Sequence, residues 1–510
     1  MKAVKNPLKA GAVAALVVVG LCFPAQAQAP LDIRIALVIG NSSYAGAPLV
    51  NPANDARAMG DTLRGLGFTV VELRDGRKEQ MTGAIAKVRD ALQGKQGVGM
   101  LYYAGHGLQL DWRNYMVPVD ASLAQASDVP QQTVDVNSVI DAFKAAGNRM
   151  NILVLDACRD NPFTGSASGK GLAQLDAPPG TFLAFATAPG NVAEDGDVRS
   201  GNGLYTQFLL DELKKPASKI EDVFKRVRFQ VRKHSQGRQI PWESTSLEDD
   251  FYFNTGKVLA VAKPDDKARE LAFTVEKGDW DKIKDSKRAE DFYAFLQKYP
   301  NGNISELAQA RLERLDVAKV VAQADRTGLV QTPAAARFRD GDRFEFNFKD
   351  GLSGVVTRVG SAVLRRVSED EWEGRGTGMA VTRANSRAFL IQDAGGRYDP
   401  PWPTVPGGDF QVGKKWSSRS IFTPFNGSKS WVDIDATITA REKVTVPLGT
   451  FDAYRVDYSF NWQSGQRVKM SFWYHPEIGY ALKLIQETRR NVGPPDIMVR
   501  EMTAYHRGSG

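Results

Sequence analysis

The 510-residue sequence predicts an α/β domain with a mostly parallel sheet and helices on both faces, followed by a helical hairpin and an antiparallel β domain. Three observations predict this order. In the first half, short apolar runs alternate with amphipathic stretches at helical spacing. The middle of the chain is rich in charge and keeps the helical period. From about residue 336 onward the hydrophobic period is two, which is typical of half-buried strands.

Residues 1–29 have the three parts of a secretory signal peptide. Three lysines stand among the first nine residues, an apolar stretch covers 12–23, and two overlapping small-residue cleavage sites end at Ala27 and Ala29. The apolar stretch is short for a membrane span. We therefore expect a protein that is secreted across the inner membrane into the periplasm, with no membrane span.

The net charge and the number of cysteines limit the classes of function that the sequence allows. The formal net charge is +7 and becomes +4 (7 − 3) without the three signal lysines, which is too mild an excess to indicate nucleic-acid binding. A lipoprotein signal with lipidation at Cys22 is the weaker alternative to the secretory signal peptide, because Leu21 stands where lipoprotein signals carry a small residue.

After removal of the signal peptide, Cys158 is the one remaining cysteine and cannot form an internal disulfide. It is either a functional thiol in an oxidising compartment or a buried, inert side chain.

Five apolar runs alternate with five amphipathic stretches between about residues 31 and 255. The runs, expected to be strands, are Ile33–Ile39, Phe68–Leu73, Val98–Tyr103, Ile152–Leu155 and Thr181–Ala186. The stretches, expected to be helices, are Asn54–Leu66, Lys78–Leu92, Val136–Ala146, Leu204–Lys214 and Glu221–Lys233. Near-continuous apolar strands with helical crossovers predict a parallel sheet covered on both faces. Asn51, Asn54 and Asp55 can cap the first helix.

Two further regions follow this domain. Residues 257–335 are expected to form a helical linker with a hairpin that turns at Pro300-Asn301-Gly302. Residues 336–507 alternate apolar and polar side chains, as in Arg343–Phe348 and Trp431–Ala436. We predict that these residues form an antiparallel β domain, either a sandwich or an open barrel.

Two of the apolar runs end in residues that can perform nucleophilic catalysis. One ends at His106, next to Gly107, and another ends 52 residues later (158 − 106) at Cys158. Ligands gather at the carboxyl ends of parallel strands, so the fold can bring both side chains together. A thiolate can attack a carbonyl carbon while imidazole takes the proton and later protonates the leaving amine. The backbone N–H groups of Gly107 and Cys158 are candidates for an oxyanion hole.

Several ordered motifs of residues 31 to 255 resemble the caspase-like peptidases, within them the metacaspase and paracaspase branches and their bacterial exported relatives. These motifs are ALVIGNSSY, NDA, LYYAGHG, LVLDACRDNPF, FATAPGNVAEDG and NGLYTQFLLDEL. The resemblance implies a caspase-like α/β fold and a cysteine-type endopeptidase. It also implies that His106 and Cys158 form a catalytic dyad without a third carboxylate. The segment after the cysteine, which begins at Arg159, departs from the small residues of eukaryotic metacaspases and is similar to the exported branch.

Carboxylates near the dyad predict a preference for substrates with Arg or Lys. Asp156 lies two residues before the cysteine, so it points to the same side of its strand. By the resemblance, Asp55 in the NDA motif and Glu194 and Asp195 after the FATAPG motif match acidic pocket positions. Such carboxylates bind a guanidinium bidentately and make the local potential negative. The alternatives are a helix cap for Asp55 and a solvated loop for Glu194 and Asp195.

The remaining expectations concern processing, cofactors and partners. Lys170, in a segment rich in Gly, Ser and Ala, is a candidate self-cleavage site. No compact Asp-rich calcium loop is present in the sequence, and we expect neither a metal nor another cofactor. The expected partners are protein or peptide substrates with basic residues, and a cell-envelope ligand for the β domain. We expect a monomer. The alternative functions are a catalytically silent caspase-fold scaffold and a cell-envelope binding protein that acts through its β domain.

Overall fold

A computed structural model describes most of the chain after residue 32. The described residues are 33–111, 113–158, 172, 175, 177–187, 201–256, 266–315, 338–368, 371–377, 382–385, 389–404, 412–476, 478–489 and 495–508. Ile33–Gly510 forms one compact unit. The expected signal peptide, residues 1–29, lies outside the described residues.

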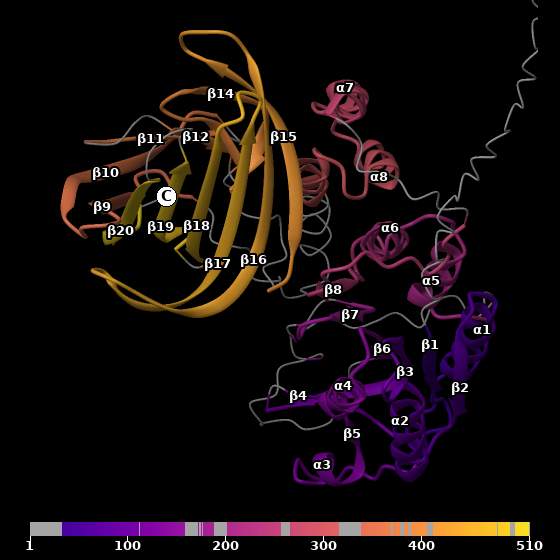
Figure 1. Ribbon diagram of the computed structural model, residues 1–510. Coiled ribbons are helices and arrows are strands. Elements are labelled where there is room, and N and C mark those ends of the chain that lie inside the picture. The colour runs from indigo at the N-terminus through magenta and orange to yellow at the C-terminus, as the bar shows by residue number, and fades with distance from the viewer. Residues whose placement is uncertain are drawn as a thin grey trace, which may run out of the picture. The chain divides into compact units, whose positions relative to one another are not determined.

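The α/β region contains the predicted strands and helices, with three short elements and one edge strand added (Figure 1). In chain order it consists of β1 (Arg34–Gly40), α1 (Pro52–Gly65), β2 (Thr69–Arg74), α2 (Lys78–Leu92), β3 (Val98–Leu110), β4 (Arg113–Met116), α3 (Asp128–Gln132), β5 (Val134–Asp135), α4 (Val136–Ala145), β6 (Met150–Cys158), β7 (Thr181–Phe185), α5 (Leu204–Leu213), α6 (Ile220–His234) and β8 (Trp242–Thr245). Each predicted helix begins and ends within about two residues of its observed bounds.

The central sheet has the strand order β2-β1-β3-β6-β7-β8. Neighbours from β2 to β7 pair in parallel, and β8 pairs antiparallel with β7 at one edge. Strand β3 continues beyond the sheet and pairs antiparallel with β4. The predicted mostly parallel sheet is therefore confirmed. Strand β8 was not predicted, because its four residues, Trp-Glu-Ser-Thr, carry too little apolar pattern to mark a strand.

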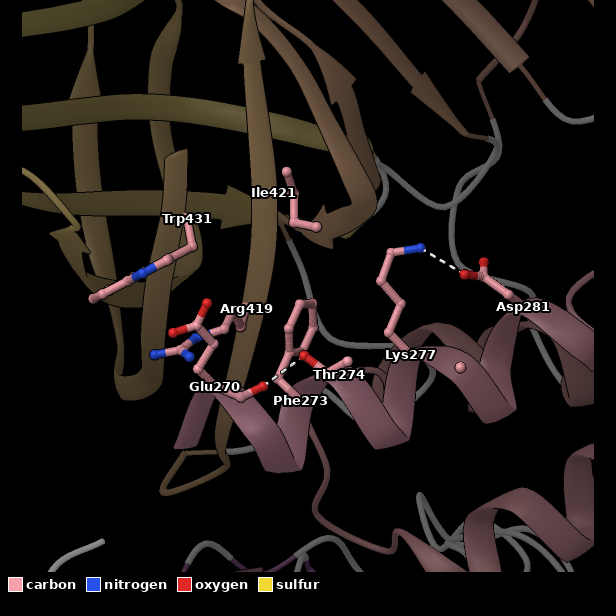
Figure 2. Close-up of a pocket in the computed structure, with 9 residues that line it drawn as sticks. Glu270, Phe273, Thr274, Lys277, Asp281, Arg419, Ile421 and Trp431 are labelled. Atoms are coloured by element: carbon pink, nitrogen blue, oxygen red, sulfur yellow. Dashed lines mark hydrogen bonds and ion pairs between the residues drawn. The ribbon is translucent and has the colours of Figure 1, made fainter. Parts of the chain in front are cut away.

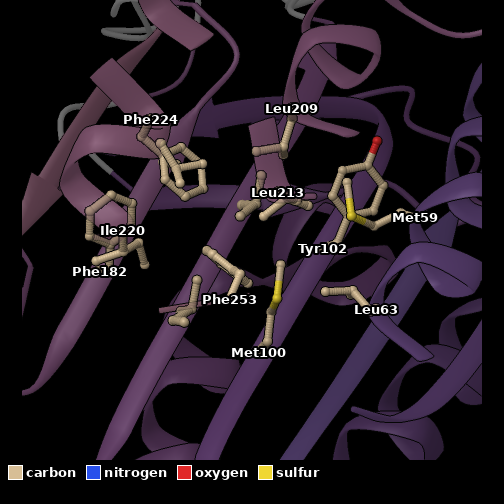
Figure 3. Packing of buried hydrophobic residues seen from close by; sticks show 14 of the residues in the cluster. Met59, Leu63, Met100, Tyr102, Phe182, Leu209, Leu213, Ile220, Phe224 and Phe253 are labelled. Carbon is tan, nitrogen blue, oxygen red and sulfur yellow. The ribbon is translucent and has the colours of Figure 1, made fainter. Parts of the chain in front are cut away.

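Helices cover both faces of this sheet, which explains why its strands read as continuous apolar runs. Alternate residues of β1 point to opposite faces, with Val38 in one core and Leu37 in the other. The first core packs against α1, α5 and α6, and Figure 3 shows Met59 and Leu63 of α1 beside Met100 and Tyr102 of β3. The second core packs against α2 and α4.

The helical hairpin is also present. It consists of α7 (Asp266–Ile283), α8 (Ala289–Lys298) and a further helical stretch at 305–315. The carboxylate of Glu276 on α7 accepts hydrogen bonds from the backbone N–H groups of Asn303 (3.0 Å) and Ile304 (2.7 Å). These bonds satisfy donors that have no partner within their own helix at its N-terminal end. Phe229 of α6 belongs to the apolar cluster of the hairpin.

The last region is a closed antiparallel barrel (Figure 1). Its strands are β9 (Arg343–Asp350), β10 (Val356–Arg366), β11 (Glu371–Arg375), β12 (Thr382–Asn385), β13 (Phe389–Gln392), β14 (Gly396–Pro403), β15 (Lys415–Pro424), β16 (Ser430–Val446), β17 (Gly449–Trp462), β18 (Arg467–His475), β19 (Tyr480–Arg489) and β20 (Asp496–His506). Strand β9 pairs with both β10 and β20 and so closes the barrel.

The antiparallel β domain is confirmed, but its expected form as a sandwich or open barrel was wrong. The alternation that predicted the strands is visible in β9, where Phe344, Phe346 and Phe348 are buried. Closure depends on the pairing of β9 with β20, whose first residues lie 153 positions apart (496 − 343). A period of two predicts that a residue belongs to a strand and says nothing of that strand's partner. The predicted domain boundaries at 255, 257, 335 and 336 stay a prediction.

Two glycines of the α/β region should respond to alanine in opposite directions. A Cβ at Gly40, the last residue of β1, would lie 2.1 Å from the Pro52 carbonyl oxygen, whereas a Cβ at exposed Gly83 in α2 would meet nothing within 4 Å. Gly40→Ala should lower the free energy of unfolding by about 1–3 kcal/mol, because backbone must move. Gly83→Ala should raise it by about 0.5–1 kcal/mol, because alanine favours a helix. Urea unfolding of both variants checks this, and a neutral Gly40→Ala would contradict it.

Candidate active site

The register of two central strands brings the predicted dyad to neighbouring backbone positions. Strands β3 and β6 are parallel neighbours, and His106 on β3 is the direct partner of Cys158 on β6. Asp156 pairs in the same ladder with Ala104. The side chain of Cys158 lies outside the described part of the structure. The sequence prediction that the fold can bring these two residues together at one end of the sheet agrees with this register.

The His106 side chain has a defined orientation. Its Nε2 atom lies 2.7 Å from the backbone oxygen of Ala47, and its ring packs on the ring of Tyr44 with centroids 4.4 Å apart. A carbonyl oxygen only accepts hydrogen bonds, so Nε2 carries the proton in this contact. In a neutral imidazole Nδ1 is then the nitrogen that can accept a proton. The contact with Ala47 thus selects the tautomer and fixes the plane of the ring.

The hydroxyl groups of two tyrosines form hydrogen bonds with the backbone of His106. The backbone N–H of His106 donates to the Tyr44 hydroxyl at 3.0 Å, and the Tyr103 hydroxyl donates to the His106 carbonyl oxygen at 2.6 Å. The Tyr44 hydroxyl in turn donates to the carbonyl oxygen of Val117 at 3.0 Å. Burial raises the pKa of Tyr44 to about 12, so its hydroxyl keeps its proton at neutral pH and remains a donor.

Glycines on both sides of His106 make this arrangement sterically feasible. Gly105 has a φ of +154°, and a Cβ there would lie 2.7 Å from the Tyr44 hydroxyl and 2.8 Å from the Tyr103 hydroxyl. A Cβ at Gly107 would lie 2.9 Å from the Cβ of Ala157 on β6. These distances are too short for any side chain. The sequence motif YAGHG therefore has a local physical reason, because the tyrosine hydroxyls and β6 occupy the space that side chains would need.

Two of the predicted pocket carboxylates lie close together. Asp55 on α1 is 2% exposed and accepts a hydrogen bond from the backbone N–H of Gly203 at 3.0 Å. Asp156 on β6 is partly exposed and accepts one from the Thr206 hydroxyl at 2.7 Å. A Cβ at Gly203 would lie 3.2 Å from Asp55 Oδ2 and 3.7 Å from Asp156 Oδ2. The two oxygens are therefore at most 6.9 Å apart (3.2 + 3.7).

The alternative interpretation of Asp55 as a helix cap does not hold. The N-cap of α1 is Asn51, whose side chain makes no capping hydrogen bond, and the Ala53 N–H in the first turn donates to Ser42 Oγ at 3.0 Å. The Asp55 carboxylate instead bonds to Gly203, which lies just before α5 and 148 residues further along the chain. This contact between distant parts of the chain holds the Asp55 carboxylate next to the start of α5.

Sequence analysis missed the residues that support this acidic pair. Thr206 on α5 is fully buried, and its hydroxyl lies 2.5 Å from the buried hydroxyl of Tyr102 on β3. Burial raises the pKa of Tyr102 well above its usual value, and the nearby charges of Asp55 and Asp156 raise it further. Thr206 lies within the NGLYTQFLLDEL motif, but nothing in its spacing separates it from an ordinary helix residue. Only the fold brings α5 to the end of β6.

Three further predicted residues, Glu194, Asp195 and Lys170, lie outside the described residues. Among the described residues, no cluster of three or more His, Cys, Asp or Glu side chains could hold a metal ion. Over the same part of the chain, no helix combines the length and the apolar character that crossing a bilayer requires.

A separate cavity of about 350 Å³ lies against α7 and the strands β15 and β16 (Figure 2). Its wall on α7 includes Phe273 and Lys277, and its wall on the barrel includes Arg419, Ile421 and Trp431. None of the candidate site residues lines it. The Arg419 guanidinium lies over the ring of Trp431 and forms an ion pair with Asp433.

The α/β region is similar to known proteins. Residues 33–252 match the family model of the caspase domain. Two curated relatives align with 185 residues of this chain at 32% identity. They are mucosa-associated lymphoid tissue lymphoma translocation protein 1 from Homo sapiens and its Mus musculus homolog. The alignment covers 35% of this chain and 21–22% of those proteins, so the chain spans about a fifth of their length. The Drosophila initiator caspase Dronc aligns at 16% identity and a TM-score of 0.32, over 44% of this chain and 83% of that one.

Residues 33–252 are therefore similar to the caspase domain, and this match covers less than half of the chain. The similarity agrees with the fold that the sequence motifs implied. The covered segment includes both members of the predicted dyad and the two neighbouring carboxylates.

The tyrosine network under His106 gives a prediction that needs no assay of activity. Tyr44→Phe removes a buried hydroxyl that bonds to the His106 N–H and the Val117 oxygen. We expect a loss of about 1–3 kcal/mol in the free energy of unfolding, because the His106 N–H loses its partner, whereas the Val117 oxygen keeps the Tyr103 hydroxyl as a donor. Tyr115→Phe, whose hydroxyl is not part of this network, is the matched control and should cost less. Urea unfolding measures both, and equal stability of Tyr44→Phe and wild type would contradict the expectation.

Proposed function

We propose that this caspase domain is an active cysteine endopeptidase that uses a Cys158–His106 dyad and cleaves after Arg or Lys. The observation that carries the proposal is the pairing of His106 with Cys158 at the end of the parallel ladder between β3 and β6, with two carboxylates near this end of the sheet. The thiol and the imidazole supply the nucleophile and the proton carrier. The carboxylates would bind a basic side chain of the substrate.

The orientation of His106 supports its role as the base. Because Nε2 donates to the Ala47 oxygen, Nδ1 is left to take the proton from the Cys158 thiol. The thiolate then adds to the substrate carbonyl carbon. As the C–N bond breaks, the imidazolium returns its proton to the leaving amine, and an acyl-enzyme thioester remains. Water, deprotonated by the same imidazole, hydrolyses the thioester and restores the thiol.

The backbone of Gly107 supports an oxyanion hole. The N–H of Val117 donates to the His106 oxygen, and Gly107 is the direct antiparallel partner of Met116 on β4. Hydrogen-bonded and non-bonded pairs alternate along an antiparallel ladder, so Gly107 is expected at a non-bonded position with its N–H directed away from β4. That N–H, together with the N–H of Cys158, would stabilise the oxygen that becomes negative during attack.

The substrate preference rests on Asp55 and Asp156. Two carboxylates within 7 Å of each other make a region of negative potential that attracts a guanidinium or ammonium and repels an aspartate side chain. A guanidinium matches carboxylate oxygens bidentately, so arginine should bind better than lysine. Gly203 leaves space between the two carboxylates, which any side chain there would fill.

The proposal extends to location and partners. Residues 1–29 carry the features of a secretory signal, so we place the protein in the periplasm, acting on protein or peptide substrates as a monomer. Glu194 and Asp195 remain candidates for the pocket, and Lys170 for self-cleavage. A catalytically silent scaffold and a binding protein that acts through its β domain are the competing functions, and the following measurement separates them.

Hydrolysis of short peptide amides tests the activity itself. Purified protein should release a reporter amine from substrates that end in Arg or Lys, and much more slowly from those that end in Asp. Cys158→Ala should retain less than about a thousandth of the wild-type rate, because no nucleophile is left. Absence of turnover on all three substrates with an intact thiol would refute the peptidase. A preference for Asp would keep the peptidase and refute the acidic pocket.

Replacing Asp156 tests the pocket separately from the dyad. Asp156→Asn should lower kcat/KM on Arg substrates by about 10- to 100-fold, because a charge-assisted hydrogen bond is lost. Asparagine keeps the shape and can still accept from Thr206, so the fold should be unchanged. Asp141→Asn, an exposed aspartate on α4, is the matched control and should have no effect. Equal losses on Arg substrates and on neutral substrates would contradict a role in recognising the basic side chain.

A further inference from the structure

One hairpin of the barrel extends beyond its packed wall. Residues 351–359, which form the turn between β9 and β10 and the start of β10, are all exposed. In a barrel wall every second side chain points inward and is buried. Here side chains on both sides of the strand are in solvent, and β11 pairs with β10 only from Val363 onward. We refer to residues 351–359 as the hairpin tip.

The hairpin tip is rich in aliphatic side chains. Leu352 is 74% exposed, Val355 62%, Val356 44% and Val359 63%. Single apolar residues on a surface are common, but four within eight positions give the hairpin tip an apolar patch. Exposure of these apolar side chains to water is unfavourable, so we expect an apolar surface of a partner to cover the patch.

The hairpin tip itself carries a positive charge. Residues 351–359 contain one arginine, Arg358, and neither Asp nor Glu. The guanidinium of Arg358 lies 4.0 Å from the ring centroid of Phe348, and it has no carboxylate partner within the described parts of the chain. At the base of the hairpin tip, the Asp350 carboxylate accepts the backbone N–H groups of Ser353 (2.7 Å) and Leu352 (3.1 Å). The backbone of the turn therefore already binds the carboxylate of Asp350 at the base of the hairpin tip.

The hairpin tip lies on the wall of the barrel away from the helices. Within the closed barrel, β10 and β16 are separated by six strand positions in either direction. Strand β16 carries Asp433, which pairs with Arg269 of α7 at 2.6 Å. The described helices therefore contact the opposite wall, and the apolar patch remains open to a partner.

We propose that the hairpin tip docks on the surface of an anionic phospholipid bilayer. The aliphatic side chains enter the boundary between headgroups and acyl chains, and Arg358 pairs with lipid phosphate. A protein partner is the less favoured occupant, because protein interfaces are rich in aromatic anchors and this patch contains only Leu and Val. The proposal concerns the β domain and does not depend on peptidase activity.

Co-sedimentation of the full chain with lipid vesicles tests this inference. We expect binding to vesicles of phosphatidylcholine and phosphatidylglycerol (about 7:3), and at least ten-fold weaker binding to phosphatidylcholine alone, because apolar insertion and phosphate attraction add. The triple variant Leu352→Ser, Val355→Ser, Val356→Ser should lower binding to the mixed vesicles by at least about ten-fold. Arg358→Gln should lower it several-fold and reduce its dependence on salt.

A matched control removes equally exposed aliphatic side chains elsewhere. Leu271 (66% exposed) and Val275 (50%) lie on α7, and the double variant Leu271→Ser, Val275→Ser should bind vesicles as wild type does. Circular dichroism confirms that each variant is folded. Failure of the wild type to sediment with either vesicle would overturn the proposal, as would a triple variant that binds as wild type does or a control that loses binding equally.

Discussion

The candidate site depends on the close parallel pairing of β3 with β6 in one register. This register makes His106 the partner of Cys158 and Ala104 the partner of Asp156. It requires glycine at 107, because a Cβ there would meet Ala157 on the neighbouring strand. A slip of one residue would turn the side chains of β6 to opposite faces of the sheet. The proposed nucleophile, the proposed base and one proposed pocket carboxylate are therefore positioned by a single backbone ladder.

Other elements of the fold contact the residues that this ladder positions. The loop after β1 brings Tyr44 and Ala47 to the imidazole, so that both its backbone and its ring are held. On the other side, α1 and α5 bring Asp55 and Thr206 to the carboxylate of Asp156. These contacts join residues far apart in the chain, which explains why a parallel sheet with loops gathered at one end is an effective scaffold for a site. The buried hydroxyls are rigid supports for the groups that would meet a substrate.

Much of the α/β domain could be predicted from local pattern, because helix and strand periods are local properties. The position of His106 and Cys158 at one end of the parallel sheet could be predicted too, since each ends an apolar run. Thr206 and Tyr44 could not, because a buried hydroxyl leaves no periodic signal and its role depends on a distant partner. Strand β8 is too short to carry a pattern, and barrel closure depends on the pairing of β9 with β20. Local pattern thus predicts elements, whereas pairing and polar support require the fold.

The reactivity of the Cys158 thiol tests the central claim, that His106 and Cys158 act as a unit, without any substrate. The rate of alkylation by iodoacetamide, followed at Cys158 by mass spectrometry between pH 5 and pH 9, reports how much thiolate is present. If the imidazole activates the thiol, labelling should stay fast at pH 6 and slow by at least about ten-fold in His106→Ala. Labelling that is slow at pH 6 and equal in both proteins would show an ordinary thiol and would contradict the account.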